Sequence, residues 1–379
     1  MALDTTPVIA AAVRTPQGRE DGVFANTRSE DLSIPLVETI LDETGLDPAV
    51  VDDLMWGCAQ QRGEQDNNLA RVIALLSPLG ESTPAATINR WCASSMQAIA
   101  SAADAITAGQ RQCVIAGGVE SMSRVPMDVG DDLHPDTGER YNVFDLRMGM
   151  TAEKVASEHG VSREAQDEYA LRSHERAAEA ADSGRFDDEI VPIETEEGTI
   201  TEDEGIRRDT SLGKLADLPP AFTGDGTVTA GNASRISDGA AGTLVCSEAF
   251  AGEHGLDVLA RVGDHNVAGV DPTVMGIGPV PATRGLLEHT GESIDDFGLV
   301  ELNEAFASQC LYSKRELGVP DDRFNVNGGA IAIGHPLGAS GARLPVTLLH
   351  EMEKRDAKKG LATLCVGFGQ GMAMGFERP

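Results

Sequence analysis

Alternating apolar and polar segments predict an α/β fold in the first and last parts of the chain. The continuous apolar run Val8–Val13 is typical of a buried strand, and apolar residues at helical spacing over 33–43 predict the helix that follows it. The same alternation returns after residue 240. Further strands are predicted at 51–56, 113–116, 241–246, 258–262, 299–302 and 361–366, and further helices at 93–109, 281–290 and 342–353.

The middle of the chain, residues 118–239, has a different pattern. Proline, glycine and acidic residues are frequent there, and strand signals are weak. One long amphipathic helix is predicted over 163–183, and the acidic stretch 194–209 is expected to be solvated surface. We therefore expect this segment to form an inserted loop domain.

The two α/β parts resemble copies of each other. An acidic pair ending at Asp53 precedes a strand in the first part, and a similar pair ends at Asp296 in the second. The same offset carries Cys92 onto His335, so a duplication would place both residues in equivalent loops; a chance match of short segments is the alternative. The predicted division is a first core half over 1–117, completed by about 240–262, a loop domain over 118–239 and a second core half over 263–379.

Composition adds a strong charge bias. The 379 residues include 61 Asp and Glu against 30 Lys and Arg, giving a formal net charge of −31, and only 6 of the basic residues are lysine. Such a surface repels nucleic acid and anionic membranes, so neither is an expected partner. The acidic, lysine-poor pattern resembles that of proteins from salt-loving organisms, in which concentrated salt screens self-repulsion.

Neither a membrane segment nor a metal site is predicted. No apolar run approaches the roughly 20 residues of a membrane span, and the N-terminus lacks the regions of a signal peptide. The six cysteines are widely scattered, without pairs at zinc or redox spacing. We expect reduced thiols in a cytoplasmic protein.

Two loops carry candidate catalytic side chains. Cys92 precedes a helix rich in small residues, and a helix N-terminus is expected to lower a thiol pKa. The alternative is a small buried apolar residue. His335 lies in the glycine-rich stretch 325–341, on a Gly-His-Pro turn that suits a positioned base; the alternative is an ordinary polar loop residue.

Two strand ends add further candidates. Cys365 closes a predicted strand, and the following Gly367 could donate its backbone N–H to an oxyanion; a core cysteine and a tight turn are the alternative. Asn303 follows the strand 299–302 and could orient a water molecule or a carbonyl group, or else cap a helix.

Together these stretches resemble the signature motifs of the thiolase family, in the family's order. The motifs are 89–97, 301–307, 325–341 and 364–372, and 117–123 and 226–234 are similar to two more. The resemblance covers essentially the whole chain. It implies a duplicated five-layer αβαβα core with an inserted loop domain that binds coenzyme A. It also implies an acyltransferase that moves acyl groups between coenzyme A thioesters by reversible Claisen chemistry.

The resemblance also implies roles for the catalytic residues. Cys92 would be the nucleophile that becomes acylated, and His335 would activate both Cys92 and the thiol of coenzyme A. Cys365 would exchange a proton with the α-carbon of acetyl-CoA. Asn303, through a water molecule, and His335 would form one oxyanion hole. The backbone N–H groups of Cys92 and Gly367 would form the other.

Substrate contacts implied by the resemblance come mainly from the loop domain. They are Ser234 at the pantetheine, Phe222 and Ala230 along its wall, Arg207 near the adenine, Met148 at the reactive end, and Phe306. For Arg207, a surface charge is the alternative. Two positions depart from the family pattern: Arg235 stands where glycine is frequent, and Arg147 where short-chain biosynthetic members carry histidine.

Other details favour a degradative 3-ketoacyl-CoA thiolase of fatty-acid β-oxidation: the Met-Gly-Met-Thr segment 148–151, the turn 368–371 and the dipeptide His134-Pro135. The alternative is a short-chain biosynthetic acetoacetyl-CoA thiolase. A ketoacyl-synthase-type enzyme would replace Cys365 by His or Asn. A non-catalytic acyl-CoA-binding subunit would usually lack a catalytic side chain. We expect coenzyme A as a substrate, no permanently bound cofactor or metal, and a homodimer or homotetramer.

Overall fold

A computed structural model describes residues 5–127 and 133–379 of the protein. Its N-terminal half supplies one end of a mixed sheet, with strand order β4-β3-β5-β8-β1. β3 pairs in parallel with both β4 and β5, whereas β8 pairs in antiparallel fashion with β5 and β1. These strands are β1 (Pro7–Arg14), β3 (Asp53–Gly57), β4 (Ala85–Ile88), β5 (Cys113–Ser121) and β8 (Ser237–Ser247), and the short β2 (Gly18–Arg19) also pairs with β8.

The C-terminal half continues this sheet in the order β10-β11-β12-β9. β10 pairs in parallel with β11, and β12 lies antiparallel between β11 and β9. The two halves join where Val8 of β1 pairs with Arg261 of β9. The strands are β9 (Ala260–Gly269), β10 (Leu299–Leu302), β11 (Lys359–Val366) and β12 (Gln370–Glu377).

The two halves share one topology, as the sequence pattern predicts. Leu54 of β3 pairs with Ile115 of β5, and Val300 of β10 pairs with Leu361 of β11 at the same sequence separation. A parallel bridge from Val300 to Phe324 takes the place of the edge strand β4. The duplication therefore extends to strand order and register.

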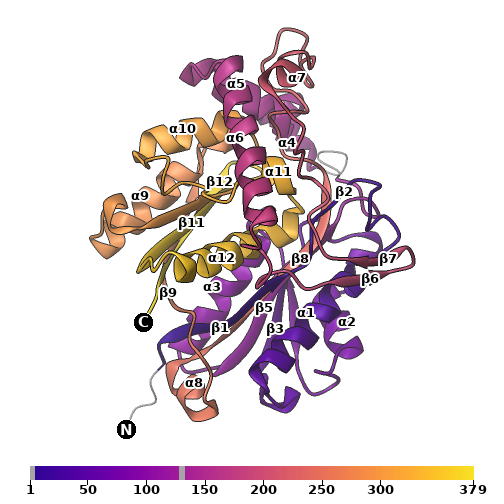
Figure 1. Ribbon diagram of the computed structural model, residues 1–379, viewed down its shortest axis with the longest axis vertical. Coiled ribbons are helices and arrows are strands. Elements are labelled where there is room, and N and C mark those ends of the chain that lie inside the picture. Colours follow the sequence, from indigo (N-terminus) through magenta and orange to yellow (C-terminus); the bar gives the residue numbers. More distant parts are fainter. Residues whose placement is uncertain (1–4, 128–132) are drawn as a thin grey trace.

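Helices complete five layers around the two halves of the sheet (Figure 1). In β5, Val114 and Ala116 face the core that contains α3 and α12, whereas Ile115 faces the core that contains α1 and α2. A third core packs α9 and α10 on the far side of the C-terminal strands. These helices are α1 (Ser29–Thr44), α2 (Leu69–Leu76), α3 (Ser94–Thr107), α9 (Pro279–Thr290), α10 (Ala307–Leu317) and α12 (Leu337–Lys354), and α8 (Glu248–His254) lies between β8 and β9.

Most of the segment between β5 and β8 lies at the top of the molecule in Figure 1, whereas its short strands β6 and β7 extend to the right of the N-terminal half. Buried hydrogen bonds anchor it to the C-terminal half: Tyr169 and Ser173 donate to the carboxylate of Glu304, at 2.8 and 2.6 Å. Its elements are α4 (Pro135–Arg140), α5 (Met148–His159), α6 (Arg163–Asp182), β6 (Ile193–Thr195), β7 (Gly198–Ile200) and α7 (Leu212–Ala216), and α6 packs against α11 (Ala330–Ile333).

The structure corrects several boundaries predicted from sequence. β5 continues through Gly117 and Gly118, because these glycines permit close packing rather than a turn; a Cβ on Gly118 would lie 2.3 Å from the carbonyl oxygen of Gly338. α12 begins at Leu337, five residues earlier than expected, despite its glycines. β12 was not predicted, because its glycine-rich start was interpreted as a turn.

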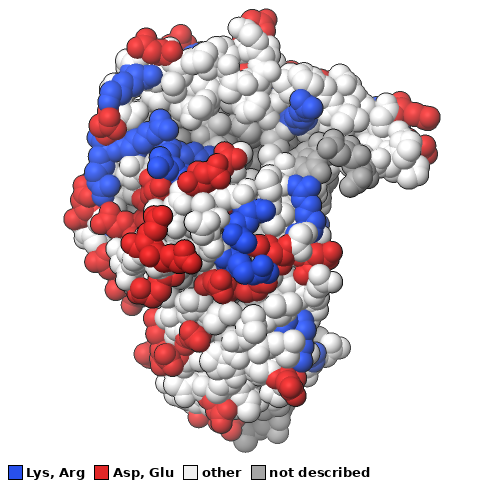
Figure 2. Space-filling model, turned by 90° about the vertical axis from the view of Figure 1, so that its right-hand side faces the viewer, with Lys and Arg blue, Asp and Glu red and all other residues white. Residues whose placement is uncertain are grey.

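One acidic residue of the expected solvated stretch is instead buried. Asp203 accepts two hydrogen bonds from the buried guanidinium of Arg14, at 2.7 and 3.0 Å. Glu189 accepts a third at 2.6 Å, so the buried cation is paired and its hydrogen-bonding groups are satisfied. Elsewhere acidic side chains are spread over most of the face shown in Figure 2.

Two further expectations concern features of the whole chain. Among the described residues, no helix has the length and apolar character needed to cross a membrane. All six cysteines are free and buried.

Candidate active site

Cys92 lies at the tip of a constrained turn that leads into α3. The turn is closed by hydrogen bonds from Trp91 N–H to Asn89 Oδ1 at 2.9 Å and from Arg90 N–H to Ser94 Oγ at 3.0 Å. Trp91 has a φ of 46°, a left-handed conformation that is strained for a bulky residue. The turn thereby directs Cys92 to its position two residues before the helix.

His335 occupies the equivalent position before α12, also two residues ahead of the helix. Gly334 has a φ of 123°, and a Cβ there would lie 2.6 Å from the Ser237 hydroxyl oxygen. The backbone N–H of His335 donates to that hydroxyl at 3.1 Å. Glycine at position 334 therefore allows the backbone of His335 to pack against β8, and this contact sets the position of the imidazole ring.

The two loops are joined because α3 and α12 meet at their N-terminal ends. A Cβ on Gly341 would lie 2.5 Å from the backbone nitrogen of Met96, and Ala342 N–H donates to Ser95 Oγ at 2.8 Å. Gly338 N–H also donates, at 2.8 Å, to the buried carboxylate of Glu120. Glu120 accepts further N–H groups from residues 59 and 60, so it links both halves beneath the site.

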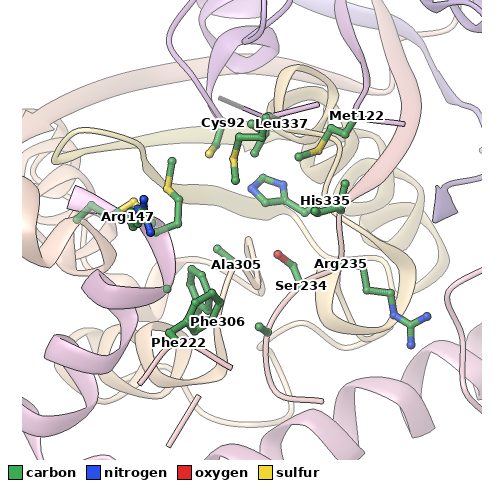
Figure 3. Close-up of a pocket in the computed structure, with 16 residues that line it drawn as sticks. Cys92, Met122, Arg147, Phe222, Ser234, Arg235, Ala305, Phe306, His335 and Leu337 are labelled. Carbon is green, nitrogen blue, oxygen red and sulfur yellow. The ribbon is translucent and has the colours of Figure 1, made fainter. Parts of the chain in front are cut away.

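Cys92 and His335 both line a cavity of about 520 Å³ (Figure 3). Among the residues expected to contact substrate, the cavity is lined by Met148, Phe222, Ser234 and Phe306. Ala230 and Arg207 are exposed and do not line it. The remaining lining residues, which we did not predict as contacts, are Met122, Met127, Arg147, Gly149, Ala233, Arg235, Ile236, Met275, Ala305 and Leu337.

The protonation state of the His335 ring follows from its hydrogen bonds. Its Nδ1 lies 2.5 Å from Ser340 Oγ, and that hydroxyl donates to the carbonyl oxygen of Pro336 at 2.8 Å. Since the single hydroxyl proton is used there, Ser340 accepts from Nδ1–H and leaves Nε2 unprotonated. Burial, together with the charge of Arg343, lowers the pKa of His335 to about 3. His335 is therefore a neutral base.

Asn303 lies against this imidazole. Its Nδ2 is 3.3 Å from Nε2 and 3.4 Å from Nδ1 of His335. Its buried Oδ1 has no hydrogen-bond partner among the described residues. The N-cap alternative is wrong, since Phe306 caps α10. The Asn303 amide and the His335 ring thus form a polar pair with hydrogen-bonding capacity left for a substrate oxygen or a water molecule.

The pKa of Cys92 differs from the expectation. The backbone N–H groups of Gly367 and of Cys92 itself favour the thiolate, but burial outweighs them and raises the pKa to about 12. Only 2% of Cys92 is exposed, and α3 begins two residues later. Burial therefore affects the pKa of Cys92 more strongly than the N-terminus of α3 does. At rest, Cys92 is a neutral thiol that requires a base.

Cys365 lies near Cys92 at the end of β11. Burial raises the pKa of the Cys365 thiol, and the charge of Cys92 raises it further. It belongs to a small apolar cluster with Met148 and Phe306, both of which line the cavity. A Cβ on the neighbouring Gly367 would lie 2.9 Å from the terminal methyl of Met148 and 3.3 Å from the Trp91 ring, so the backbone there is closely packed against both side chains.

These groups can support acid–base and nucleophilic chemistry. They comprise a thiol nucleophile facing two backbone N–H donors, a neutral imidazole, an amide and a second thiol. Within the described ranges, no group of three or more His, Cys, Asp or Glu side chains is arranged to hold a metal ion.

Sequence reasoning missed several residues that shape the site. Ser340 is part of the glycine-rich stretch, five residues after His335. Its contact with His335 could not be predicted, because it depends on α12 beginning at Leu337, earlier than the sequence pattern indicated. Trp91 flanks Cys92, but its left-handed backbone follows only from the folded turn. Arg147 and Arg235 were visible as departures from the family pattern, without an assigned role.

Family models match both parts of the chain. "Thiolase, N-terminal domain" matches residues 7–249, and "Thiolase, C-terminal domain" matches residues 256–378. Together they cover nearly all of the described sequence.

Individual relatives agree with these matches. The chain is 50% identical to the 3-ketoacyl-CoA thiolase of Pseudoalteromonas translucida (strain TAC 125), over 98% of each chain. It is 49% identical to the 3-ketoacyl-CoA thiolase of Aliivibrio fischeri (strain ATCC 700601 / ES114), over 98% of this chain and 99% of the relative. The crystal structure of the Bacillus anthracis acetyl-CoA acetyltransferase superposes with a TM-score of 0.92 at 42% identity, covering 100% of both chains.

Proposed function

The chain belongs to the thiolase family, and on this premise we propose that it is a catalytic 3-ketoacyl-CoA thiolase. This acyltransferase converts a 3-ketoacyl-CoA and coenzyme A into a shortened acyl-CoA and acetyl-CoA. The observation that carries the proposal is that Cys92 and His335 line one cavity, with Asn303 against the His335 ring and Cys365 close to Cys92. A non-catalytic subunit is disfavoured because such a protein would usually lack at least one of these four side chains.

The first half-reaction forms an acyl-enzyme. Nε2 of His335 takes the proton of Cys92, and the sulfur attacks the C3 carbonyl carbon of the substrate. The N–H groups of Cys92 and Gly367 favour negative charge at the sulfur, which supports a role for them in stabilising the adjacent oxyanion. The C2–C3 bond then breaks, and its electron pair passes into the enolate of acetyl-CoA.

Proton return and acyl transfer complete the cycle. Cys365 donates a proton to C2 of the enolate, whose oxygen is stabilised by the Asn303 and His335 pair. After acetyl-CoA leaves, coenzyme A enters, and its thiol loses a proton and attacks the acyl group on Cys92. The proton on His335 passes to the Cys365 thiolate, and the neutral imidazole then takes the proton of the coenzyme A thiol. As the second thioester departs, His335 returns that proton to the sulfur of Cys92, so all three residues regain their starting protonation.

We propose the degradative direction because the named 3-ketoacyl-CoA thiolases are similar over 98% of this chain. The apolar lining formed by Met148, Phe222, Phe306 and Met275 also suits an acyl chain. The alternative, a biosynthetic acetoacetyl-CoA thiolase, is favoured by the likeness to the acetyl-CoA acetyltransferase. Cleavage of acetoacetyl-CoA and of a longer 3-ketoacyl-CoA in molar salt tests both. We expect higher kcat/KM for the longer substrate; cleavage of neither would reject the proposal.

The proposal also covers the cellular environment, the ligands, the oligomeric state and the domain division. The net charge of −31 and the 6 lysines support a function in a salt-rich cytoplasm. Coenzyme A acts as a substrate, with no permanently bound cofactor or metal and no nucleic-acid or membrane partner. We propose a homodimer or homotetramer. The division into core half 1–117, completed by about 240–262, loop domain 118–239 and core half 263–379 also belongs to this proposal.

A further inference from the structure

Two arginines without an ion-pair partner in the described part of the chain, Arg147 and Arg235, line the cavity, and Arg207 lies close to Arg235, although acidic residues outnumber basic ones two to one in the chain. Among the described residues, the guanidinium groups of Arg147, Arg207 and Arg235 form no hydrogen bond or ion pair; Arg147 stacks only on Phe144. By contrast, neighbouring Arg208 pairs with Asp182 at 2.7 Å. The unpaired Arg207 and Arg235 therefore differ from Arg208, which has a carboxylate partner.

Arg235 is the most constrained of these cations. It lines the cavity directly after Ser234, and it is only partly exposed. Burial, together with the charges of Arg207 and Arg19, lowers the pKa of Arg235 to about 10. Repulsion from two like charges means that the cluster is incomplete without an anion.

No nearby carboxylate neutralises this cluster fully. Glu204 acts on Arg235 electrostatically, but its carboxylate is already bound to Arg19 Nε at 2.7 Å. It also accepts the backbone N–H groups of Arg19 and Val23, at 3.0 and 3.1 Å. The backbone N–H of Arg207 donates to Nδ1 of the buried His174 at 3.1 Å. Burial lowers the pKa of His174, and the charges of Arg235 and Arg207 contribute, so both arginines lie near this one imidazole.

The cluster lies at the end of the cavity remote from the reactive groups. Cys92 and His335 form the inner end, Ser234 lies between, and the guanidinium of Arg235 points away from them (Figure 3). Ile236, the next residue in the chain, also lines the cavity and is 37% exposed, so this part of the lining reaches the surface. In a coenzyme A thioester, the phosphate groups lie at the end of the molecule remote from the sulfur.

We propose that Arg235, with Arg207 beside it, binds a phosphate group of coenzyme A, either in its diphosphate or at its 3′-position. Planar guanidinium groups bind phosphate oxygens in pairs, and a partly desolvated site strengthens these charge-assisted bonds. This site would retain a polyanionic substrate on a protein whose overall charge repels it. The inference rests on the proposed function, since it takes the thioester to react at Cys92.

The test compares acetoacetyl thioesters of coenzyme A, dephospho-coenzyme A and pantetheine. Arg235→Ala should raise KM for the coenzyme A thioester about ten- to hundred-fold with little change in kcat, as expected for lost charge-assisted bonds. KM for the pantetheine thioester should not change, and Arg235→Lys should restore part of the loss. Loss of the effect with the dephospho substrate would identify the 3′-phosphate; its persistence would identify the diphosphate. Arg208→Ala is the matched control.

Calorimetric binding of coenzyme A and of adenosine 3′,5′-bisphosphate gives a readout that does not require turnover. Weaker binding of coenzyme A by Arg235→Ala than by Arg208→Ala supports the site. Unchanged binding, or an equal increase in KM for the pantetheine thioester, would overturn it. If the wild type binds coenzyme A but cleaves no thioester, the proposed function fails while this binding test still stands.

Discussion

Nδ1 of His335 lies 2.5 Å from the hydroxyl oxygen of Ser340, within the first turn of α12. Because that hydroxyl donates to the carbonyl oxygen of Pro336, it fixes the histidine proton on Nδ1 and leaves Nε2 free to accept a proton. In the proposed reaction Nε2 accepts the proton of Cys92, so Ser340 is a positioning residue that acts through the histidine.

Replacing this hydroxyl tests the tautomer directly. Ser340→Ala should lower kcat about ten-fold, the kinetic equivalent of a buried hydrogen bond worth about 1–1.5 kcal/mol, with KM nearly unchanged. Ser340→Thr should recover much of the loss, and Ser157→Ala, at an exposed serine of α5, should have no effect. Nitrogen NMR of His335 should show mixed tautomers in the alanine variant. An unchanged kcat together with an unchanged spectrum would show that Ser340 does not set the tautomer.

Cysteine labelling tests whether Cys92 is accessible through the cavity. All six cysteines are buried, but Cys92 is the cysteine that lines the cavity. Iodoacetamide should therefore modify Cys92 faster than Cys58, Cys113, Cys246, Cys310 and Cys365, and an acyl-CoA should protect it. Peptide mass spectrometry of timed samples measures each rate. Similar rates for several cysteines, or no protection, would count against the site.

The pH dependence of this labelling follows from the two pKa values. With His335 at about 3 and Cys92 at about 12, the resting pair is neutral throughout the range between. The wild-type rate should thus stay flat from about pH 5 to 9, because His335 takes the proton as the sulfur reacts. In His335→Ala the rate should instead rise about ten-fold per pH unit, following the thiolate fraction. A wild-type midpoint near neutral pH would mean that a thiolate–imidazolium pair forms at rest.

Salt dependence tests the proposed habitat. With a net charge of −31, repulsion extends over about 30 Å at 0.01 M salt but only about 3 Å at 1 M. Melting temperature and activity should both rise from millimolar towards molar KCl. Full activity and an unchanged melting temperature at about 0.05 M salt would contradict the proposal that the protein functions in a salt-rich cytoplasm.

The sequence was sufficient to predict the fold for a physical reason. Continuous apolar runs define buried strands, and the two copies place Cys92 and His335 in equivalent loops. Glycines were harder to interpret, because a glycine in a turn and one against another backbone have the same sequence. Gly118 and Gly338 belong to the second kind, and this accounts for the incorrect ends of β5 and α12.

Electrostatic properties of the site were less predictable. A helix N-terminus was expected to lower the pKa of Cys92, but burial depends on residues far away in sequence and has the larger effect. The unpaired state of Arg235 likewise depends on Arg19 and Glu204, which come from distant segments. The balance between burial and neighbouring charges can therefore be judged only from the folded structure.

The most direct test of the proposed division of roles compares Cys92→Ser and Cys365→Ser with both half-reactions measured. Acetyl transfer from acetyl-CoA to the protein is followed by intact mass, and exchange of the α-hydrogens of acetyl-CoA by NMR in heavy water. Cys365→Ser should still form an acetyl-enzyme on Cys92 but should exchange α-hydrogens at least about 100-fold more slowly, as expected for a lost acid–base group. Cys92→Ser should lose acetylation. Equal losses of both half-reactions in the two variants, or acetylation at a residue other than Cys92, would contradict the mechanism.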